Sequence, residues 1–265
     1  MKEKTQAKFN QVRGILRDRN VLVAVSGGVD SSVLAALAVD SAKKVVLLTI
    51  DSSIVTSTDR KGLDDLAEKF DVEPVVVEFD WIGHDKLAKN PPERCYNCKK
   101  ELAALWKKEA ERRGLDMVVE GTNASDLGKD RPGIKALKEL GIRSPLAEAG
   151  ITKREIREYA AERDLPSAHI PSSTCLATRF QSGTQITEER LDKIAAAEEI
   201  VRSLFGIQCV RARYHGNLVR VEVGNDERKN LFDLQKLDNL HRELKDLGFD
   251  YVTIDVYGYQ SGSMG

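Results

Sequence analysis

The stretch from Asn20 to Ser41, NVLVAVSGGVDSSVLAALAVDS, constrains the fold of this 265-residue chain more than any other. It opens with five apolar residues, 21–25, a short run rich in valine that predicts a buried parallel strand. Two glycines follow, and an apolar helical pattern then continues from Val33 to Ala38. A strand, a glycine turn and a helix in this order are typical of a phosphate site, because a helix start offers unpaired N–H groups.

The turn itself, SGGVDSS, carries groups suited to a nucleotide. Glycine allows positive φ and leaves no Cβ between the backbone and a phosphate. The serines add hydroxyl donors, and Asp30 is placed where a carboxylate can help to hold Mg²⁺ beside the phosphates. A tight turn with a Ser or Asp helix cap needs no ligand, but the complete string favours a nucleotide site. The residues assigned to it are Ala24, Ser26, Gly27, Gly28, Asp30, Ser31 and Ser32.

Further apolar runs alternate with helical patterns and predict an α/β fold with a parallel sheet. Strands are expected at residues 44–51, 73–79 and 116–120, and helices at 57–70 and 96–113. The carboxyl ends of such strands meet at one sheet edge, where ligands bind. The further candidates at that edge are Asp51, Gly121, Thr122, Asp126 and Arg131. Taken alone, Asp126 and Arg131 are equally well explained as solvated loop charges.

The pattern changes after residue 180, where we place a domain boundary between residues 1–180 and 181–265. Residues 187–205 predict a helix, and 209–214 and 218–223 predict two strands around a turn. A helix at 229–247 and a strand at 251–257 complete the order. The sequence therefore predicts a parallel-sheet domain followed by a smaller α+β domain.

Composition limits the classes of function. The formal net charge of −1 gives no basic field that would favour nucleic acid. No apolar run approaches the length of a membrane span. The N-terminal stretch is too polar for a signal peptide, so we expect a cytoplasmic protein. In that compartment the four cysteines are expected to be thiols, catalytic groups or metal ligands rather than disulfides.

Three cysteines are candidates for chemistry. Cys95 and Cys98 form a CxxC motif at a helix start, and Cys175 stands in an irregular loop. Cys209, in a predicted strand, is best explained as a small core residue. The CxxC motif fits a redox pair, part of a zinc site that His169 could complete, or ligands of an iron–sulfur cluster. A four-iron cluster held by Cys95, Cys98 and Cys175 would leave one iron without a protein thiolate.

The SGGVDSS string resembles the PP-loop of the ATP pyrophosphatase superfamily. Members of that superfamily adenylate an acceptor oxygen, release pyrophosphate and let a nucleophile displace AMP. Seven motifs together resemble the LarE family, ATP-dependent sulfur transferases of nickel-pincer nucleotide biosynthesis. These motifs are SGGVDSS, NPPERCYNCKK, EGTNASD, TKREIRE, PSSTCLATRF, RARYHG and GYQSGSM, and the resemblance extends over nearly the whole chain.

The resemblance implies a substrate and two routes for sulfur. A carboxylate of pyridinium-3,5-biscarboxylic acid mononucleotide would be adenylated, and sulfur would then replace AMP. In some members a cysteine at the position of Cys175 gives up its own sulfur. In others three cysteines, matched here by Cys95, Cys98 and Cys175, hold a [4Fe-4S] cluster that presents sulfide from an outside source. The resemblance also implies a homo-oligomer, and we expect ATP, Mg²⁺ and the cluster as cofactors.

The second domain supplies candidate contacts to this substrate. Arg211 and Arg213 alternate along a predicted strand, so both guanidinium groups can point to one face. Arginine suits bidentate recognition of phosphate or carboxylate, although two solvated strand charges would look the same in sequence. Glu199 and Glu222 match acidic positions of similar proteins and are otherwise ordinary carboxylates.

Three other functions remain open. A PP-loop enzyme that thiolates tRNA is the nearest, but the near-zero net charge and the lack of further cysteine pairs argue against it. An ammonia-using ligase of the NAD or GMP synthetase kind gives no reason for the cysteines. A nucleotide-binding regulator without turnover is the alternative outside enzymes.

Overall fold

The computed structural model describes residues 3–127, 132–168, 170, 174–260 and 264. By packing, the chain forms two compact units, each described by itself below. The first comprises Met1–Phe79 and Glu93–Ser173, and the second comprises Asp80–Pro92 and Thr174–Gly265. Residues 174–180, expected in the first domain, pack with the second unit, and so does the segment Asp80–Pro92.

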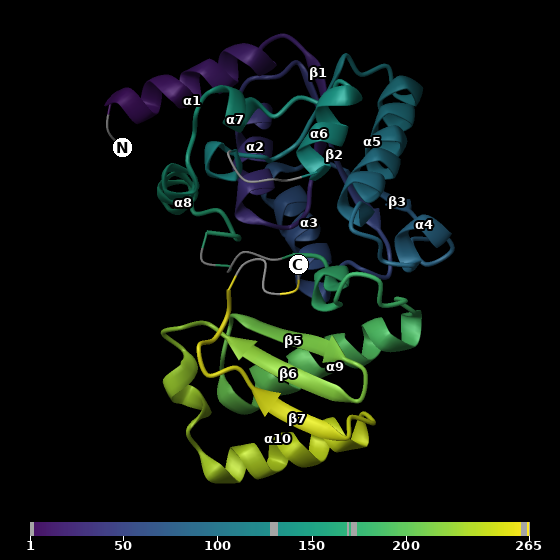
Figure 1. Cartoon of the computed structure of the whole chain (residues 1–265). Helices are drawn as coiled ribbons and strands as arrows, with labels where there is room; N and C mark the ends of the chain where they lie inside the picture. The colour runs from purple at the N-terminus through teal and green to yellow at the C-terminus, as the bar shows by residue number, and fades with distance from the viewer. Residues whose placement is uncertain (1–2, 128–131, 169, 171–173, 261–263, 265) are drawn as a thin grey trace. The chain divides into compact units, whose positions relative to one another are not determined.

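The first unit is built on a four-stranded parallel sheet, as predicted (Figure 1). Its strands are β1 (Asn20–Ala24), β2 (Lys44–Asp51), β3 (Pro74–Glu78) and β4 (Met117–Val119), in the order β3-β2-β1-β4. All three strand pairs are parallel. β1 is therefore flanked on both edges, and its residues 21–24 are all buried. This explains why its sequence is a continuous apolar run rather than an alternating one.

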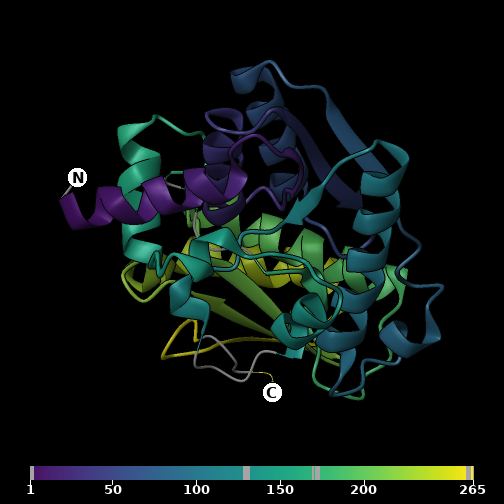
Figure 2. The ribbon, with the colours of Figure 1, turned by 90° about the horizontal axis from the view of Figure 1, so that it is seen from above.

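Helices cover both faces of this sheet (Figure 1; Figure 2). The helices of the unit are α1 (Glu3–Leu16), α2 (Val29–Val39), α3 (Ser57–Phe70), α5 (Arg94–Arg112), α6 (Pro132–Glu139), α7 (Pro145–Glu148) and α8 (Lys153–Glu162). Val21 and Val23 of β1 belong to the apolar core with α1, α2, α3 and α8. Leu22 and Ala24 belong to the opposite core, with α5 and α6. Successive strand residues point to opposite faces, so one short strand anchors both layers.

A capping box lies at the start of α8, and its glutamate also joins that helix to α1. Thr152 accepts a hydrogen bond from the Glu155 backbone, and the Glu155 side chain accepts one from the Thr152 backbone. Lys8 of α1 donates to Glu155 Oε1 at 2.8 Å. Burial by itself raises the pKa of the Glu155 carboxyl, but hydrogen bonds from Lys8 and Thr152 outweigh burial and lower this pKa to about 2.

We expect Glu155→Gln to lower the free energy of unfolding by about 2–3 kcal/mol at pH 7. Because the pKa of Glu155 is depressed in the folded state, its stabilisation is present above the unfolded pKa, near 4.5, and is lost as the pH falls towards about 2. Urea unfolding of variant and parent between pH 7 and pH 2 should therefore show converging stabilities. Glu158→Gln, on the exposed side of α8, is the control and should change little. A constant difference across this pH range would contradict the assignment.

The second unit is the smaller α+β unit that the sequence predicts. It contains α4 (Asp85–Ala88), α9 (Glu188–Phe205), β5 (Val210–His215), β6 (Leu218–Val223), α10 (Leu234–Asp246) and β7 (Tyr251–Ile254). The sheet order is β5-β6-β7, with β5 antiparallel and β7 parallel to β6. Two short 3-10 helices, η2 (Leu176–Arg179) and η3 (Arg228–Leu231), lie before α9 and α10, and a third, η1 (Ala124–Asp126), belongs to the first unit.

Two predicted boundaries in this unit are wrong. The helix expected at 229–247 is split into η3 and α10, because Asp233 caps α10 by accepting a hydrogen bond from the Lys236 backbone. The strand expected at 251–257 ends at Ile254, and the Tyr257 and Gly258 backbones donate instead to the Asp255 side chain. Side chains that bond locally to the backbone compete with regular structure in this way. Across the described ranges, no helix is both long and apolar enough to span a bilayer.

Candidate functional site

The SGGVDSS loop joins β1 to α2 in a form that leaves the helix start open. Gly27 has φ +73°, a left-handed conformation that glycine adopts without strain. Gly28 is the N-cap of α2, and no side chain caps the helix there. The hydroxyls of Ser31 and Ser32 both donate to the Gly28 carbonyl at 3.0 Å. The N–H groups of the first turn are thus available to an anion, which the helix dipole also favours.

Two more glycines let other elements approach this loop closely. A Cβ on Gly62 of α3 would lie 2.5 Å from Gly27 Cα and 2.8 Å from its carbonyl oxygen. A Cβ on Gly121, just after β4, would lie 2.8 Å from the Ser31 backbone nitrogen. Both positions therefore require glycine, since the contacted atoms are backbone and cannot swing away. The loop is wedged between α3 on one side and the β4 end on the other.

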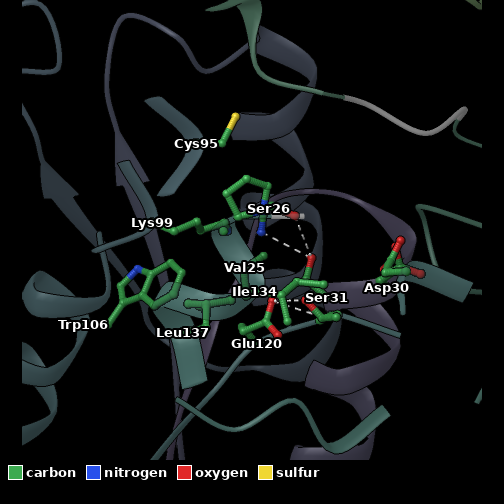
Figure 3. A pocket seen from close by; sticks show the side chains of 16 residues that line it. Val25, Ser26, Asp30, Ser31, Cys95, Lys99, Trp106, Glu120, Ile134 and Leu137 are labelled. Carbon is green, nitrogen blue, oxygen red and sulfur yellow. Dashed lines mark hydrogen bonds between the residues drawn. The ribbon is translucent and has the colours of Figure 1, made fainter. Parts of the chain in front are cut away.

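A cavity of about 510 Å³ lies in the first unit beside this loop (Figure 3). Its walls come from the ends of β1 and β4 and from α5 and α6. The lining residues are Ala24, Val25, Ser26, Asp30, Ser31, Cys95, Lys99, Trp106, Glu120, Gly121, Thr122, Asp126, Pro132, Gly133, Ile134 and Leu137. The structure thus brings the SGGVDSS loop, the Gly121–Asp126 segment and one cysteine of the CxxC motif to a single cavity.

Asp30 is the charged residue of the loop that faces this cavity. Its Oδ2 accepts a hydrogen bond from Lys153 Nζ at 2.6 Å, across 123 residues of sequence. Its Oδ1 is buried and has no hydrogen-bond partner among the described residues. Burial raises the pKa of the Asp30 carboxyl above its usual range, Lys153 opposes this shift, and the charge of Asp126 adds to it. An oxygen left without a partner beside a second carboxylate fits a hard cation such as Mg²⁺.

A second buried carboxylate, Glu120, organises the segment after β4. It accepts hydrogen bonds from the Thr122 backbone at 3.1 Å and from the Thr122 hydroxyl at 2.9 Å. The Ser144 hydroxyl donates to its other oxygen. Asp126 completes a capping box with Asn123 in this segment, accepting from the Asn123 backbone at 3.1 Å. The two acidic side chains therefore fix the backbone that approaches the loop at Gly121.

The wall of the cavity formed by α5 and α6 is mainly apolar. Trp106 of α5 and Ile134 and Leu137 of α6 line it, as Figure 3 shows. Lys99 lies about one helical turn after Cys95 on α5. Its ammonium group is 5.4 Å from the centre of the Trp106 ring. A Cβ on Gly133 would lie 2.9 Å from Lys99 Cγ, so this glycine leaves room for the lysine stem. Lys99 is the cationic side chain among the described residues that line this cavity.

Several predicted residues of the first unit do not line the cavity. Gly27, Gly28 and Ser32 belong to the loop but are not among the residues that line the cavity. Asp51, at the end of β2, is paired with Arg60 of α3. Arg131 lies outside the described residues, as does His169.

The CxxC cysteines lie at the start of α5. Cys95 is exposed and lines the cavity, and Cys98 is half-buried one turn further along the helix. All four cysteines of the chain are thiols in the structure. Two thiols three residues apart on one helix fit a pair of ligands to one metal centre. In the part of the chain that the structure describes, no group of three or more His, Cys, Asp or Glu side chains is arranged to hold a metal ion.

The remaining candidates belong to the second unit. Cys175 is the N-cap residue of η2. Arg211 and Arg213 of β5 are both 4% exposed, so they are not solvated strand charges. Arg213 pairs with Glu222 at 2.7 Å and donates to the Thr178 carbonyl at 3.0 Å. The Arg211 guanidinium lies 5.0 Å from the centre of the Tyr259 ring. Glu199 is exposed and pairs with Arg202 at 3.3 Å.

Four residues of the cavity region escaped the sequence analysis: Lys99, Trp106, Glu120 and Lys153. Lys153 sits inside the TKREIRE motif, but nothing local to that motif indicates a partner 123 residues away. Glu120 and Lys99 adjoin predicted site residues, and their proximity to Gly121 and Cys98 is a signal that sequence could have used. Trp106 has the helical spacing of an ordinary core residue.

Comparisons with known proteins show what the chain is similar to. The family model described as "Queuosine biosynthesis protein QueC" matches residues 20–91. An uncharacterised protein of Synechocystis sp. is 36% identical over 92% of this chain and 91% of its own length. An uncharacterised protein of Methanocaldococcus jannaschii is 32% identical over 95% of each chain. The pyridinium-3,5-bisthiocarboxylic acid mononucleotide synthase of Lactiplantibacillus plantarum is 32% identical over 93% of this chain and 89% of its own.

Proposed function

The chain belongs to the LarE family, and on that premise we propose that it is an ATP-dependent sulfur transferase acting on a pyridinium carboxylate mononucleotide. The observation that carries this proposal is the whole-length similarity to a synthase whose product is a pyridinium bisthiocarboxylate. The cavity supports it, because residues of the SGGVDSS loop, predicted to bind the nucleotide, and a cysteine of the CxxC motif line the same space.

The first half-reaction is activation of the acceptor. A carboxylate oxygen of the acceptor attacks the α-phosphorus of ATP, the bond to the β-phosphate breaks, and pyrophosphate leaves. The open N–H groups at the start of α2 would bind the phosphates. Asp30 Oδ1 and Asp126 would hold Mg²⁺, which neutralises charge on the leaving pyrophosphate. Lys153 holds the other oxygen of Asp30 and so fixes the direction in which Oδ1 points.

The acceptor must reach both the α-phosphate and the sulfur source. With phosphates at the end of β1 and the nucleoside towards the end of β2, the cavity between β1 and β4 is the space left for the acceptor. Its Trp106, Ile134 and Leu137 wall suits a flat ring, and Lys99 suits a ring carboxylate. Arg211 and Arg213 are proposed to bind the phosphate or carboxylate of the acceptor, since arginine binds such groups in bidentate fashion.

The second half-reaction replaces AMP by sulfur, which attacks the activated carbonyl carbon. We propose that Cys95, Cys98 and Cys175 hold a [4Fe-4S] cluster. When bound, a cluster with three protein thiolates has one open iron that can carry sulfide. The position of Cys95 in the cavity wall supports delivery of sulfur at this place. Loss of sulfur from Cys175 itself is the competing route.

The test is anaerobic purification followed by turnover with ATP, sulfide and the acceptor. The cluster route predicts brown protein, AMP and pyrophosphate as products, more than one turnover per chain, and an unchanged mass at Cys175. Replacing any of Cys95, Cys98 or Cys175 by Ser should lower both iron content and turnover, whereas Cys209→Ser is the control.

Three results would contradict parts of this proposal. ADP and orthophosphate as main products would exclude adenylation of the acceptor. Loss of the mass of hydrogen sulfide from Cys175 after one turnover, in protein without iron, would replace the cluster route by the sacrificial one. Salt-dependent binding and thiolation of tRNA would favour the nucleic-acid alternative.

A further inference from the structure

A single buried guanidinium holds the turn that carries Cys175. Arg179, at the end of η2, is 1% exposed. Its Nη1 donates to the Thr174 carbonyl at 2.7 Å, the Thr174 hydroxyl at 2.8 Å and the Cys175 carbonyl at 3.1 Å. The same nitrogen lies 3.0 Å from the Thr178 hydroxyl. All these acceptors belong to the five-residue segment 174–178, so the Arg179 side chain contacts both the start and the end of the turn.

The Cys175 carbonyl is fixed from more than one direction. The Thr178 backbone donates to it at 3.0 Å, and the Thr178 hydroxyl donates to it at 2.9 Å. With the contact from Arg179, three donors converge on this one oxygen. Because the peptide group is held in this way, the φ and ψ of Cys175 are held too, and these angles set the direction of its Cβ. The turn thus fixes the direction in which Cβ, the atom that bears the sulfur, leaves the backbone.

The other edge of the guanidinium is held by Glu198 of α9. Arg179 Nε donates to Glu198 Oε1 at 2.8 Å, and Nη2 donates to Oε2 at 3.2 Å. Glu198 is 1% exposed, and it also accepts from the Ala212 backbone at 3.1 Å. Such a fork-to-carboxylate pair fixes the plane of the guanidinium, which a lysine cannot reproduce. The direction of Nη1 towards the Cys175 turn therefore depends on a helix and a strand that follow it in sequence.

We propose that Arg179, oriented by Glu198, is a positioning residue that holds Cys175 in the geometry needed for sulfur transfer. This inference rests on the proposed function, because it takes Cys175 as a residue of the sulfur chemistry. It gives a role to a buried ion pair that neither nucleotide binding nor acceptor activation uses.

The test compares Arg179→Gln with Arg202→Gln in the full-length protein. Arg202 also pairs with Glu198, at 2.9 Å, but among the described residues its side-chain partners are Glu198 and Glu199 rather than the Cys175 turn, so it is the matched control. The first readout is the rate of alkylation of each cysteine by iodoacetamide after iron chelation, followed by peptide mass spectrometry. We expect Arg179→Gln to change the Cys175 rate severalfold and to leave the Cys209 rate unchanged. Arg179→Lys should give an intermediate rate, and Arg202→Gln should match the parent.

Cys209 is the internal reference because it lies half-buried in the same unit. If the rates of Cys175 and Cys209 rise together, Arg179 merely stabilises the unit and the proposal is overturned. The second readout separates the half-reactions. We expect sulfur transfer to fall by about tenfold or more, as for other groups that orient a reacting ligand, while ATP–pyrophosphate exchange keeps its parental rate.

The role of Arg179 and the use of Cys175 in sulfur transfer can be tested separately. Unchanged sulfur transfer in Arg179→Gln, together with inactive Cys175→Ser, would overturn the role of Arg179 alone. Full sulfur transfer by Cys175→Ser would overturn the proposed use of Cys175, and this inference with it.

Discussion

Replacing Asp30 by Asn should lower the rate of ATP–pyrophosphate exchange by a factor of about 100 or more. The variant keeps the shape of the side chain but loses the charge that, in the proposed function, Oδ1 would present to Mg²⁺. A bound metal contributes several kcal/mol to stabilising developing charge, and each 1.36 kcal/mol is a factor of ten in rate. The exchange assay, run with the acceptor across a range of Mg²⁺ concentrations, measures this loss and should show that excess Mg²⁺ recovers little of it.

Asp40→Asn is the matched control for this prediction. Asp40 is the C-cap of the same helix, α2, and pairs with Arg163 at 2.9 Å, away from the cavity lining. It should retain the parental exchange rate. If Asp30→Asn exchanges as fast as Asp40→Asn, the carboxylate of Asp30 has no part in adenylation.

Gly62→Ala should have the second large effect, although Gly62 touches no expected ligand. The added Cβ would lie 2.5 Å from Gly27 Cα, so the SGGVDSS loop or α3 must move. Overpacking of this kind costs about 1–3 kcal/mol, and here the displaced backbone belongs to the loop that we propose binds the phosphates. We expect the KM for ATP to rise by about tenfold or more, as for a loss of about 1.4 kcal/mol in binding. Exchange kinetics measured well below the melting temperature test this.

Gly14→Ala provides the control, because it makes the same chemical change within a helix. A Cβ on Gly14 would meet no atom within 4 Å. Alanine is favoured over glycine inside a helix by about 0.5–1 kcal/mol, so this variant should be slightly more stable and fully active. Equal KM values for ATP in both variants would show that α3 does not hold the loop.

Elements whose cause is local were predictable from the sequence. Three features can each be recognised from a few consecutive residues: the apolar run of β1, the glycines of the loop and the capping box at Thr152. The structure contains all three. The parallel direction of the strands then follows from the alternation of strands and helices. For this reason the loop, Gly121, Thr122 and Asp126 could be assigned to one sheet edge before their contacts were known.

Contacts between distant residues were not predictable in the same way. Lys153 reaches Asp30 across 123 residues, and Arg179 reaches Glu198 across 19. Charged residues are common enough in this chain that composition gives no reason to pair these particular ones. The alternation of Arg211 and Arg213 correctly indicated a strand, but it did not reveal that both side chains are buried or that Glu222 takes one of them. Pairing of buried charges is decided by tertiary packing.

The second unit is discontinuous in sequence, and this has a consequence for how the protein can be divided and made. The Asn90 side chain donates to the Gln181 carbonyl at 2.8 Å, and its own carbonyl accepts from the Gly183 backbone at 2.7 Å. The Ile186 backbone likewise donates to the Ala88 carbonyl at 2.7 Å. During synthesis, residues 80–92 leave the ribosome long before residues 181–186 do. Until then, the groups of residues 80–92 that bond to residues 181–186 can bond only to water. A fragment that begins at residue 174 would lack residues 80–92 and their hydrogen bonds. Joining residues 80–92 to that fragment through a short engineered linker would restore these hydrogen bonds.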